Sequence, residues 1–400
     1  MAQSSDVTAG IVPAPPAHPF DKITVDELTA TGGMKWTRYG PGVIGAFVAE
    51  MDFGTDPAIT DALHADIDTG TLGYLPTALR DDLARATADF MAARHQWPVP
   101  AEWVHPIPDV IRGFQVAIEH FSAPGSAIVL PTPAYMPFLS VPPQMGRDII
   151  RVPMPVVDGR YVMDLEGIDR ALAGDGDLVV LCNPQNPTGR VFEPGELEAL
   201  ASVVDDRGGR VFADEIHAPL VYGERRHVPY ASVSAAAARH SVTATSASKA
   251  WNLPGLKAAQ LLLTNEVDAE RWTDIGFLAG HGASNLGVIA NTVAYRDGGP
   301  WLAEVLDYLD TSRRYLADLV AAHLPGAGMH LPEGTYLAWI DVSGLELGDR
   351  PADTLLDRAG VALIDGRRCG TPGFVRINFA TPRPILADAV ERLGAAVNDR

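Results

Sequence analysis

The stretch DLVVLCNPQNPTG, residues 177–189, decides the fold class of this 400-residue chain. Its first half is a short apolar run, as expected for a strand that is buried on both faces of a parallel sheet. Its second half is a polar loop with two prolines and a glycine, in which a strand cannot continue. Ligands of open α/β sheets bind beyond the carboxyl ends of the strands, so we expect this loop to face a ligand.

The same pattern recurs on both sides of this stretch. Helical spacing of apolar residues is seen in 58–67 and 78–95, and a further helix is expected to start near Pro194. Four more short apolar runs have the character of buried strands: SAIVL (126–130), RVFADE (210–215), HSVTATS (240–246) and AAQLLL (258–263). Strands that alternate with helices of this length predict a βαβ series and a mostly parallel sheet.

The pattern changes near Gly298. Residues 301–323 have the spacing of one long amphipathic helix, and three short apolar runs follow it at 335–342, 361–365 and 374–380. We therefore expect an α/β protein with two domains. A large domain of 51–297 has a mostly parallel mixed sheet flanked by helices, a smaller α+β domain takes up 298–400, and residues 1–50 form an arm and a segment that joins the small domain.

Composition narrows the classes of function. The formal net charge is −19 and there is no Lys/Arg-rich run, which argues against nucleic acid or an anionic membrane as a partner. The apolar runs are far shorter than the ~18 residues that span a bilayer, and the start of the chain, 1–20, lacks the basic region of a signal peptide. Two cysteines cannot form a disulfide framework. We expect a soluble, cytoplasmic protein.

Four loops that follow predicted strands carry chemically useful side chains. They are Asn183–Gly189, Asp214–His217, Ser246–Lys249 and Val375–Asn378. Together they supply an amine, a carboxylate, an amide, hydroxyls and a guanidinium. The eleven histidines form no HxxxH or HExxH pair and the two cysteines lie far apart, so no metal site is expected. There is no GxGxxG after a strand and no GxSxG motif.

These loops carry a family resemblance. NPQNPTGRVF, DEIH, SASKAWNLPGLK and FVRINFA resemble the motifs of the fold-type I, pyridoxal-phosphate-dependent class I/II aminotransferases. The flanking stretches are more similar to one branch, the cystathionine β-lyases or cysteine C–S lyases of the MalY/PatB type. They are VAEMDF, GYLP, PTPAYMPF, DEIHAPLVYGE, the segment from His281 to Trp301, and TYLAWIDVSGL. The resemblance extends from about Asp21 to the C-terminus and implies pyridoxal 5'-phosphate as the cofactor.

The resemblance implies roles around the cofactor ring. Lys249 would form the Schiff base, and Asp214 would keep the pyridine nitrogen protonated so that the ring accepts electrons from Cα. Asn186 and His217 would flank the phenolic oxygen, and Tyr135 would stack on the ring. The residues alone leave other interpretations open: a surface lysine for Lys249, a helix cap for Asp214, and packed core side chains for His217 and Tyr135.

The resemblance also implies a phosphate site and a dimer. Its groups are the hydroxyls of Ser246 and Ser248, the amine of Lys257, the backbone of Val110 and Ile111 at a helix that begins near Gly113, and Tyr74 from a neighbouring subunit. Serines and lysines on such loops can equally be plain surface residues. If Tyr74 has this role, the active site requires a homodimer.

On the substrate side, Arg376 matches the residue that grips an α-carboxylate through its planar fork, with Asn186 and Phe47 beside it. Three positions differ from the usual wording of the branch. Phe47 replaces a tryptophan, Glu50 replaces an aspartate, and Cys369 stands where an aromatic residue is common. We take the two lost rings as a sign of a wider pocket for a bulky S-substituent.

The expected function is β-elimination from an L-cysteine S-conjugate to a thiol, pyruvate and ammonia. An aminotransferase shares every step up to the carbanion and is the nearest alternative, and decarboxylation or oxidative deamination starts from the same intermediate. A regulator that only retains the fold is a further alternative. Against it, all the cofactor residues are present and no DNA-binding module fits in the short N-terminal arm.

Overall fold

The computed structural model describes residues 12–398, which form two compact units. One comprises Gly54–Leu306 and Glu333–Thr335, and we call it the large unit. The small unit comprises the described part of Met1–Phe53 together with Asp307–Pro332 and the described part of Tyr336–Arg400. The part of the predicted N-terminal arm before residue 12 lies outside the described residues, and the predicted domain boundaries remain a proposal.

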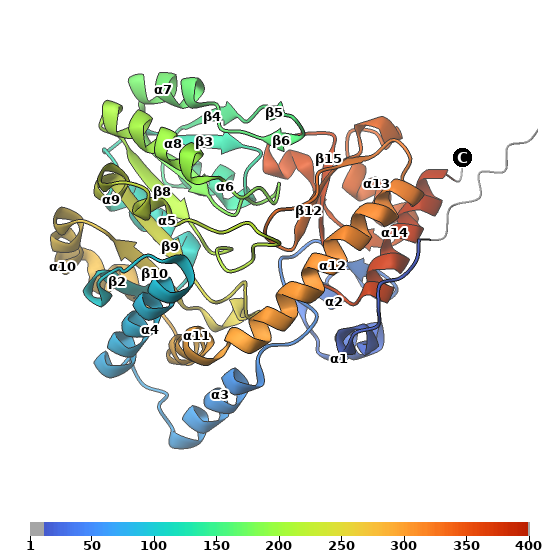
Figure 1. The fold of residues 1–400 in the computed structure, drawn as a ribbon, viewed down its shortest axis with the longest axis horizontal. Coiled ribbons are helices and arrows are strands. Elements are labelled where there is room, and N and C mark those ends of the chain that lie inside the picture. Colours follow the sequence, from blue (N-terminus) through green and yellow to red (C-terminus); the bar gives the residue numbers. More distant parts are fainter. Residues whose placement is uncertain (1–11, 399–400) are drawn as a thin grey trace, which may run out of the picture. The chain divides into compact units, whose positions relative to one another are not determined.

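The large unit is built on a seven-stranded sheet (Figure 1). The strands lie in the order β2 (Val104–Ile107), β10 (Ala259–Leu263), β9 (Ser241–Thr245), β8 (Arg210–Asp214), β7 (Gly176–Cys182), β3 (Ala127–Thr132), β4 (Ile149–Pro153). Strand β10 runs antiparallel to both of its neighbours, and all the other pairs are parallel. This confirms the mostly parallel, mixed sheet expected from the strand pattern.

Helices cover both faces of this sheet, and its central strands are buried on both sides. The helices of the large unit are α3 (Pro57–Thr69), α4 (Thr77–His95), α5 (Val110–His120), α6 (Met136–Gln144), α7 (Leu165–Ala173), α8 (Pro194–Arg207), α9 (Ala235–His240), α10 (Glu266–Gly280) and α11 (Asn285–Asp297), of which α3 packs on α11. Side chains alternate along β7: Leu178 and Val180 pack in one core cluster with residues of α5, α6 and α10. Val179 and Leu181 point to the opposite face, on the side of α7 and α8 (Figure 1).

The small unit contains a four-stranded sheet in the order β11 (Gly328–Met329), β12 (Leu337–Asp341), β15 (Phe374–Asn378), β14 (Ile364–Asp365). Its helices are α1 (Val25–Ala30), α2 (Met34–Thr37), α13 (Pro351–Ala359) and α14 (Arg383–Asn398). Helix α12 (Gly299–His323) begins in the large unit and ends in the small one, which confirms the predicted long helix and starts it two residues earlier.

Two further strand pairs and several short 3-10 helices complete the described chain. The pairs are β1 (Ile44–Gly45) with β13 (Val361–Ala362) and β5 (Val156–Val157) with β6 (Arg160–Tyr161). The 3-10 helices are η1 (Pro19–Lys22), η2 (Ala101–Trp103), η3 (Tyr230–Ser232), η4 (Pro254–Leu256), η5 (Ser343–Leu345) and η6 (Gly366–Cys369).

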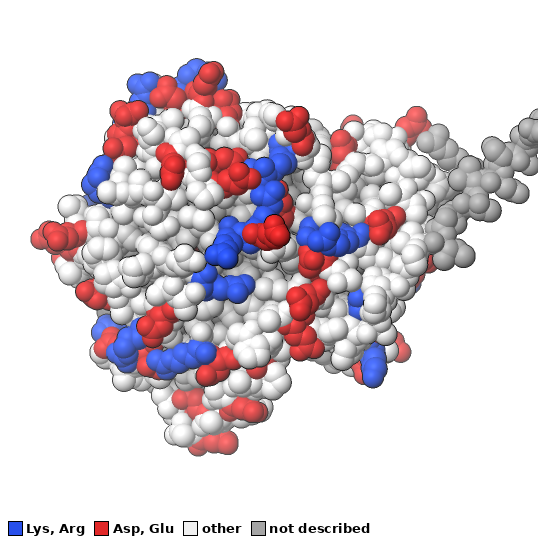
Figure 2. Space-filling model, in the orientation of Figure 1, with Lys and Arg blue, Asp and Glu red and all other residues white. Residues whose placement is uncertain are grey.

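The surface carries acidic and basic side chains side by side. On the face drawn in Figure 2 the two signs are interspersed, with one short band of basic residues next to acidic ones near its middle. Several of these charges pair within the large unit, for example Arg160 with both Glu193 and Glu333. Among residues 12–398, no helix is at once long and apolar enough to cross a membrane.

Candidate active site

Three of the four predicted loops leave neighbouring strands of the large sheet at the same edge. In the parallel register Cys182 of β7 lies opposite Asp214 of β8, and Asp214 lies opposite Ala244 of β9. The pairing continues past the strand ends, since Asn183 donates its backbone N–H to Asp214 O at 3.0 Å and Glu215 donates to Ala244 O at 2.9 Å. The sheet therefore brings the loops that begin at Asn183, Asp214 and Ser246 together.

Asp214 is a buried carboxylate with few partners. Its Oδ1 accepts the backbone N–H of Ile216 at 3.1 Å, and its Oδ2 lies 4.0 Å from the weakly donating thiol of Cys182. Burial raises the pKa of Asp214 from 3.8 to about 7, and the Ile216 N–H and the charge of Lys249 lower it in part. A cationic N–H partner would stabilise the charged form of such a buried carboxyl group.

Lys249 lies in the turn that follows β9, and that turn is anchored to helix α11. Asn291 Oδ1 accepts the backbone N–H of Ala247 at 2.9 Å, and Asn291 Nδ2 donates to Gly287 O within its own helix. The indole N–H of Trp251, which is fully buried, donates to Gly298 O at 3.0 Å. These contacts hold the backbone on both sides of Lys249. The charge of its amine lowers the pKa of Asp214.

The loop that carries Asn186 is tied to the loop that carries Tyr135. Gln185 donates from Nε2 to Pro133 O at 2.7 Å, and its Oε1 accepts from the backbone and the hydroxyl of Thr188. Gly189 closes the loop with φ +71°, a conformation that favours glycine. Asn186 is buried, and Tyr135 caps α6 with its ring edge-on to Phe138 at 5.6 Å. Asn186 and Tyr135 thus come from two loops that are joined through Gln185.

His217 is buried in the turn that follows Asp214. Its backbone carbonyl accepts the N–H of Leu220 at 2.8 Å, and Glu215 O accepts the N–H of Ala218 at 2.9 Å. The DEIH segment is therefore a tight turn that carries Asp214 and His217 at the same sheet edge. The role of His217 beside the phenolic oxygen of the cofactor stays a prediction.

The two serines before Lys249 differ in their contacts. Ser246 is buried, donates its hydroxyl to Ala258 O at 2.7 Å, and accepts the backbone N–H of Ser248 at 3.0 Å. Its single hydroxyl proton is thus directed into the protein, where it braces the turn. Ser248 is at the limit of burial. The phosphate role predicted for both hydroxyls is left as a proposal.

Lys257 lies at the N-terminus of α5. Its Nζ is 2.9 Å from Asp109 Oδ2, and Asp109 Oδ1 accepts the N–H of Arg112 as the cap of this helix. The helix starts at Val110, three residues before the start near Gly113 that was predicted, because Asp109 provides the cap. A Cβ on Gly113 would come within 2.9 Å of Ile107, so this glycine lets the helix lie close to the sheet. The backbone of Val110 and Ile111 is at the positive end of α5.

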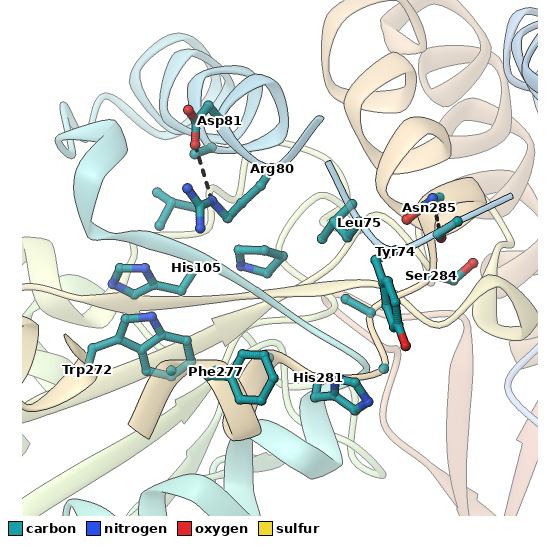
Figure 3. A pocket seen from close by; sticks show the side chains of 18 of the residues that line it. Tyr74, Leu75, Arg80, Asp81, His105, Trp272, Phe277, His281, Ser284 and Asn285 are labelled. Atoms are coloured by element: carbon teal, nitrogen blue, oxygen red, sulfur yellow. Dashed lines mark hydrogen bonds and ion pairs between the residues drawn. The ribbon is translucent and has the colours of Figure 1, made fainter. Parts of the chain in front are cut away.

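Tyr74 projects from the loop between α3 and α4 and is 93% exposed. The side-chain amide of Asn285, at the start of α11, holds this loop by donating to Thr71 O and to Gly73 O. Figure 3 shows Tyr74 beside Ser284, Asn285 and His281, at the rim of a hollow of about 1220 Å³. Large apolar side chains with little cover lie on the same unit: Leu72, Val267, Phe277 and Leu278.

The predicted carboxylate-binding residue belongs to the small unit. Arg376 is buried in β15 between Trp339 of β12 and Ile364 of β14, and its Nη2 donates to Phe47 O at 2.8 Å. The ring of Phe47 lies edge-on to Tyr39 at 5.1 Å. Arg376 and Phe47 therefore lie together, and their role in substrate binding stays a prediction.

Two of the three departures from the usual wording of the branch lie close to this pair. Glu50 follows Phe47 in a segment whose carbonyls accept the side-chain amide of Asn378, at 2.7 Å from Val48 and 2.6 Å from Glu50. Cys369 is fully buried in η6, and burial raises the pKa of its thiol to about 11.

Sequence reasoning missed the residues that hold the loops. No role was predicted for Asn291, Asp109, or the two motif residues Gln185 and Glu215. Each of them makes a side-chain contact that holds a loop bearing a predicted site residue. Two of them have a sequence signal. Asp109 stands before a helix as a cap does, and Asn291 is a poor helix former inside a helix, where such residues often bond to something else.

Comparisons with known proteins show which family the chain is similar to. The profile of the family described as aminotransferase class I and II matches residues 45–393. A cystathionine beta-lyase of Corynebacterium glutamicum is 37% identical over 378 residues, which are 93% of this chain and 99% of that protein. The crystal structure of a putative PLP-dependent beta-cystathionase of Corynebacterium diphtheriae superposes with a TM-score of 0.89 at 38% identity and covers 94% of this chain and 98% of that one. The PLP-bound C-S lyase of Staphylococcus hominis reaches 0.88 at 26%, with 95% and 99% covered.

Proposed function

This chain belongs to the aminotransferase class I and II family and is a pyridoxal-phosphate-dependent carbon–sulfur lyase, and from that premise we propose that its substrate is an L-cysteine S-conjugate. The observation that carries the proposed site is the buried, underpartnered Asp214 on the strand next to the one that leads to Lys249. The products would be a thiol, pyruvate and ammonia.

The donor set fits the cofactor. Asp214 offers a carboxylate oxygen in apolar surroundings, where the protonated ring nitrogen would neutralise it. Lys249 offers an amine for the aldehyde. The N-terminus of α5 and Lys257 offer N–H groups and a positive charge for the phosphate. When bound, pyridoxal phosphate supplies an electron sink for the pair that remains on Cα.

Different residues of this chain would then serve different steps of the elimination. We assign Arg376 to hold the substrate carboxylate, which fixes the direction of the Cα–H bond. The amine of Lys249, once released by the incoming amino group, takes the Cα proton as general base. The thiolate leaves from Cβ with the bonding electron pair, and the remaining three-carbon enamine hydrolyses to pyruvate and ammonia. Phe47 and the buried Cys369, which stand where larger rings are usual, support a bulky S-substituent.

The active form would be a homodimer. Tyr74 is almost wholly exposed, and Figure 3 shows it over a large hollow whose rim also carries Phe277. Exposed apolar side chains gathered around such a hollow are typical of a surface that a partner covers. We assign a second copy of this chain to it, with Tyr74 reaching the phosphate of that copy. A cytoplasmic location is part of the same proposal, supported by two buried, unbridged cysteines.

The test is to incubate the purified holoenzyme with a panel of cysteine S-conjugates of increasing bulk, each with and without a keto-acid acceptor. A lyase forms pyruvate, ammonia and thiol in both series, with bulky conjugates preferred over cystathionine. Strict dependence on the acceptor identifies a transaminase. Release of carbon dioxide, or use of oxygen, identifies decarboxylation or oxidative deamination. Any of these three results would contradict the proposal.

A further inference from the structure

Glu215, the residue after Asp214, is a second buried carboxylate at the same strand end. Its side chain contacts the segment at 227–230. Oε1 accepts the backbone N–H of Tyr230 at 2.7 Å, and Oε2 lies 3.1 Å from His227 Nε2. Both side chains of the Glu215–His227 pair are only 1% exposed. The backbone N–H of Tyr230 needs an acceptor, which a neutral glutamine could also supply, so this contact alone does not require a charge.

The contacts favour an ionised Glu215 and a neutral His227. Both carboxylate oxygens of Glu215 have an N–H partner, the pattern of an ionised acceptor. Within residues 12–398, His227 Nδ1 is buried and has no hydrogen-bond partner. An imidazolium would leave a charged N–H unmatched there, whereas the neutral ring with its proton on Nε2 leaves only a lone pair. The Glu215–His227 pair therefore keeps one net negative charge.

The surrounding groups do not cancel this charge. The ring of His95 stands edge-on to that of His227 with centroids 5.1 Å apart, and burial lowers the pKa of His95 to about 2, so it is neutral. Arg94, beside His95, is on the exposed side of its helix. The other titratable groups at this strand end are Asp214, Cys182, His217 and Lys249, and the charge of Lys249 acts on Asp214 in the opposite direction to that of Glu215. Consecutive Cα atoms are about 3.8 Å apart, so the charge of Glu215 acts on Asp214 through protein rather than water.

We propose that Glu215 is a positioning residue for the cofactor. Its fixed negative charge raises the pH up to which the pair formed by Asp214 and the ring nitrogen retains its proton. The charge of Glu215 acts on Asp214 in this direction in the cofactor-free chain, where it raises the pKa of the Asp214 carboxyl. His227 and the Tyr230 N–H hold Glu215 ionised. The proposal rests on the role proposed for Asp214 and does not depend on which bond of the substrate breaks.

The experiment is a pH titration of the ring nitrogen of the bound cofactor, followed by its ¹⁵N NMR chemical shift, in the holoprotein without substrate. Glu215→Gln keeps the size of the side chain and removes its charge, and we expect the midpoint of the titration to fall by about one pH unit. Glu215→Asp keeps the charge and should restore the wild-type midpoint even where its shorter side chain lowers the Tm. An unchanged midpoint in Glu215→Gln, or an equal fall in Glu215→Asp, would overturn the proposal.

Three more variants complete the design. Asp268→Asn removes another buried carboxylate, paired with Arg210 at the opposite end of β8, and should leave the midpoint unchanged. His227→Gln keeps an N–H donor but cannot be protonated, so the midpoint should stay; a rise would mean that the pair had been neutral and would overturn the proposal even if Glu215→Gln does not fold. Asp214→Asn should abolish the titration. If it does not, the role proposed for Asp214 fails, rather than that of Glu215 alone.

Discussion

Lys249 and Lys257 lie eight residues apart, but their surroundings differ. Lys249 is partly buried in a braced turn and its charge reaches Asp214, whereas Lys257 is more than half exposed and pairs with Asp109. A Schiff base needs an amine, which a guanidinium cannot replace. Only four of the 31 basic residues are lysine, and the others are arginine. The lysine at position 249 is therefore better explained by its chemistry than by the general composition of the chain.

Lys249→Ala should remove both the covalent link to the cofactor and the general base. We expect turnover to fall by about a thousandfold or more, together with loss of the visible absorbance of the bound cofactor. The matched control is Lys257→Ala, which should weaken cofactor binding but keep the absorbance at saturating cofactor. Wild-type turnover in Lys249→Ala would rule out the assignment.

Asp214 should make the stability of the cofactor-free protein depend on pH. Its folded-state pKa is raised from 3.8 to about 7, so folding takes up a proton in that window. The contribution to stability is present below about pH 4, decreases as pH rises, and is lost above about pH 7, at a rate of at most about 1.4 kcal/mol per pH unit.

Asp214→Asn should remove this dependence. Thermal unfolding of the cofactor-free wild type and variant, measured at about pH 5 and about pH 8, gives two differences in Tm whose sign is predicted. The Tm of the wild type, relative to that of the variant, should be higher at about pH 5 than at about pH 8, because only the wild type takes up the extra proton. Equal differences at the two pH values would show that the carboxyl does not titrate in this window.

At the scale of elements, the turn that carries Lys249 depends on helix α11. Asn291 accepts from Ala247 N and from Gln260 Nε2, and Gln260 Oε1 in turn accepts the hydroxyl of Tyr295, also on α11. The network joins the turn, strand β10 and α11 through groups that are all buried. Helix α11 thus sets the position of the Lys249 backbone.

Asn291→Ala should leave the buried N–H of Ala247 without its acceptor. We expect the free energy of unfolding to fall by about 1–3 kcal/mol and kcat to fall with it, since the turn before Lys249 is loosened. Thr292→Ala, at the next position, is the control, because its hydroxyl donates to Val288 O within its own helix. If both variants retain full kcat, the turn does not need this anchor.

Elements and loops could be predicted from the sequence where the signal is local. Apolar runs with polar ends identified β7, β8 and β9, and their parallel order followed from the helices between them. What the sequence does not show is how loops are braced across long separations. Asn291 bonds to Ala247, 44 positions away, and Gln185 reaches Pro133. The inward direction of the Ser246 hydroxyl also depends on a contact, with Ala258, that no motif encodes.

The same limit applies to buried charge. Lys35 was unremarkable in the sequence, but it is buried and forms an ion pair with Asp52 at 2.7 Å. The indole N–H of Trp36 donates to the second oxygen of that carboxylate. Burial of charges depends on which distant partner meets them, and a single sequence contains no such information.

At the scale of the whole molecule, the site is proposed to need two copies of the chain. If Tyr74 acts on the neighbouring subunit, Lys249→Ala and Tyr74→Ala disable different sites. In the hybrid dimer, one site combines both defects, and the other combines the intact Lys249 of one copy with the intact Tyr74 of the other. Random mixing of equal amounts should therefore restore roughly a quarter of the sites.

The measurement compares the activity of the mixed and exchanged variants with that of each alone. Recovery on mixing is expected, together with a dimer mass by light scattering. Phe277→Asp, placed on the exposed apolar surface, should give monomers and remove the recovery. No recovery in exchanged dimers would contradict the role of Tyr74, and an active wild-type monomer would contradict the shared site.

The most direct test of carbon–sulfur elimination is the number of turnovers per active site without any acceptor. The holoenzyme is given a bulky L-cysteine S-conjugate, and thiol, pyruvate and ammonia are counted against the enzyme. Elimination regenerates the link to Lys249 after each cycle, so the three products should appear in equal amounts over many turnovers. Product formation that stops after a single equivalent per site, with the amino group left on the cofactor, would contradict the account.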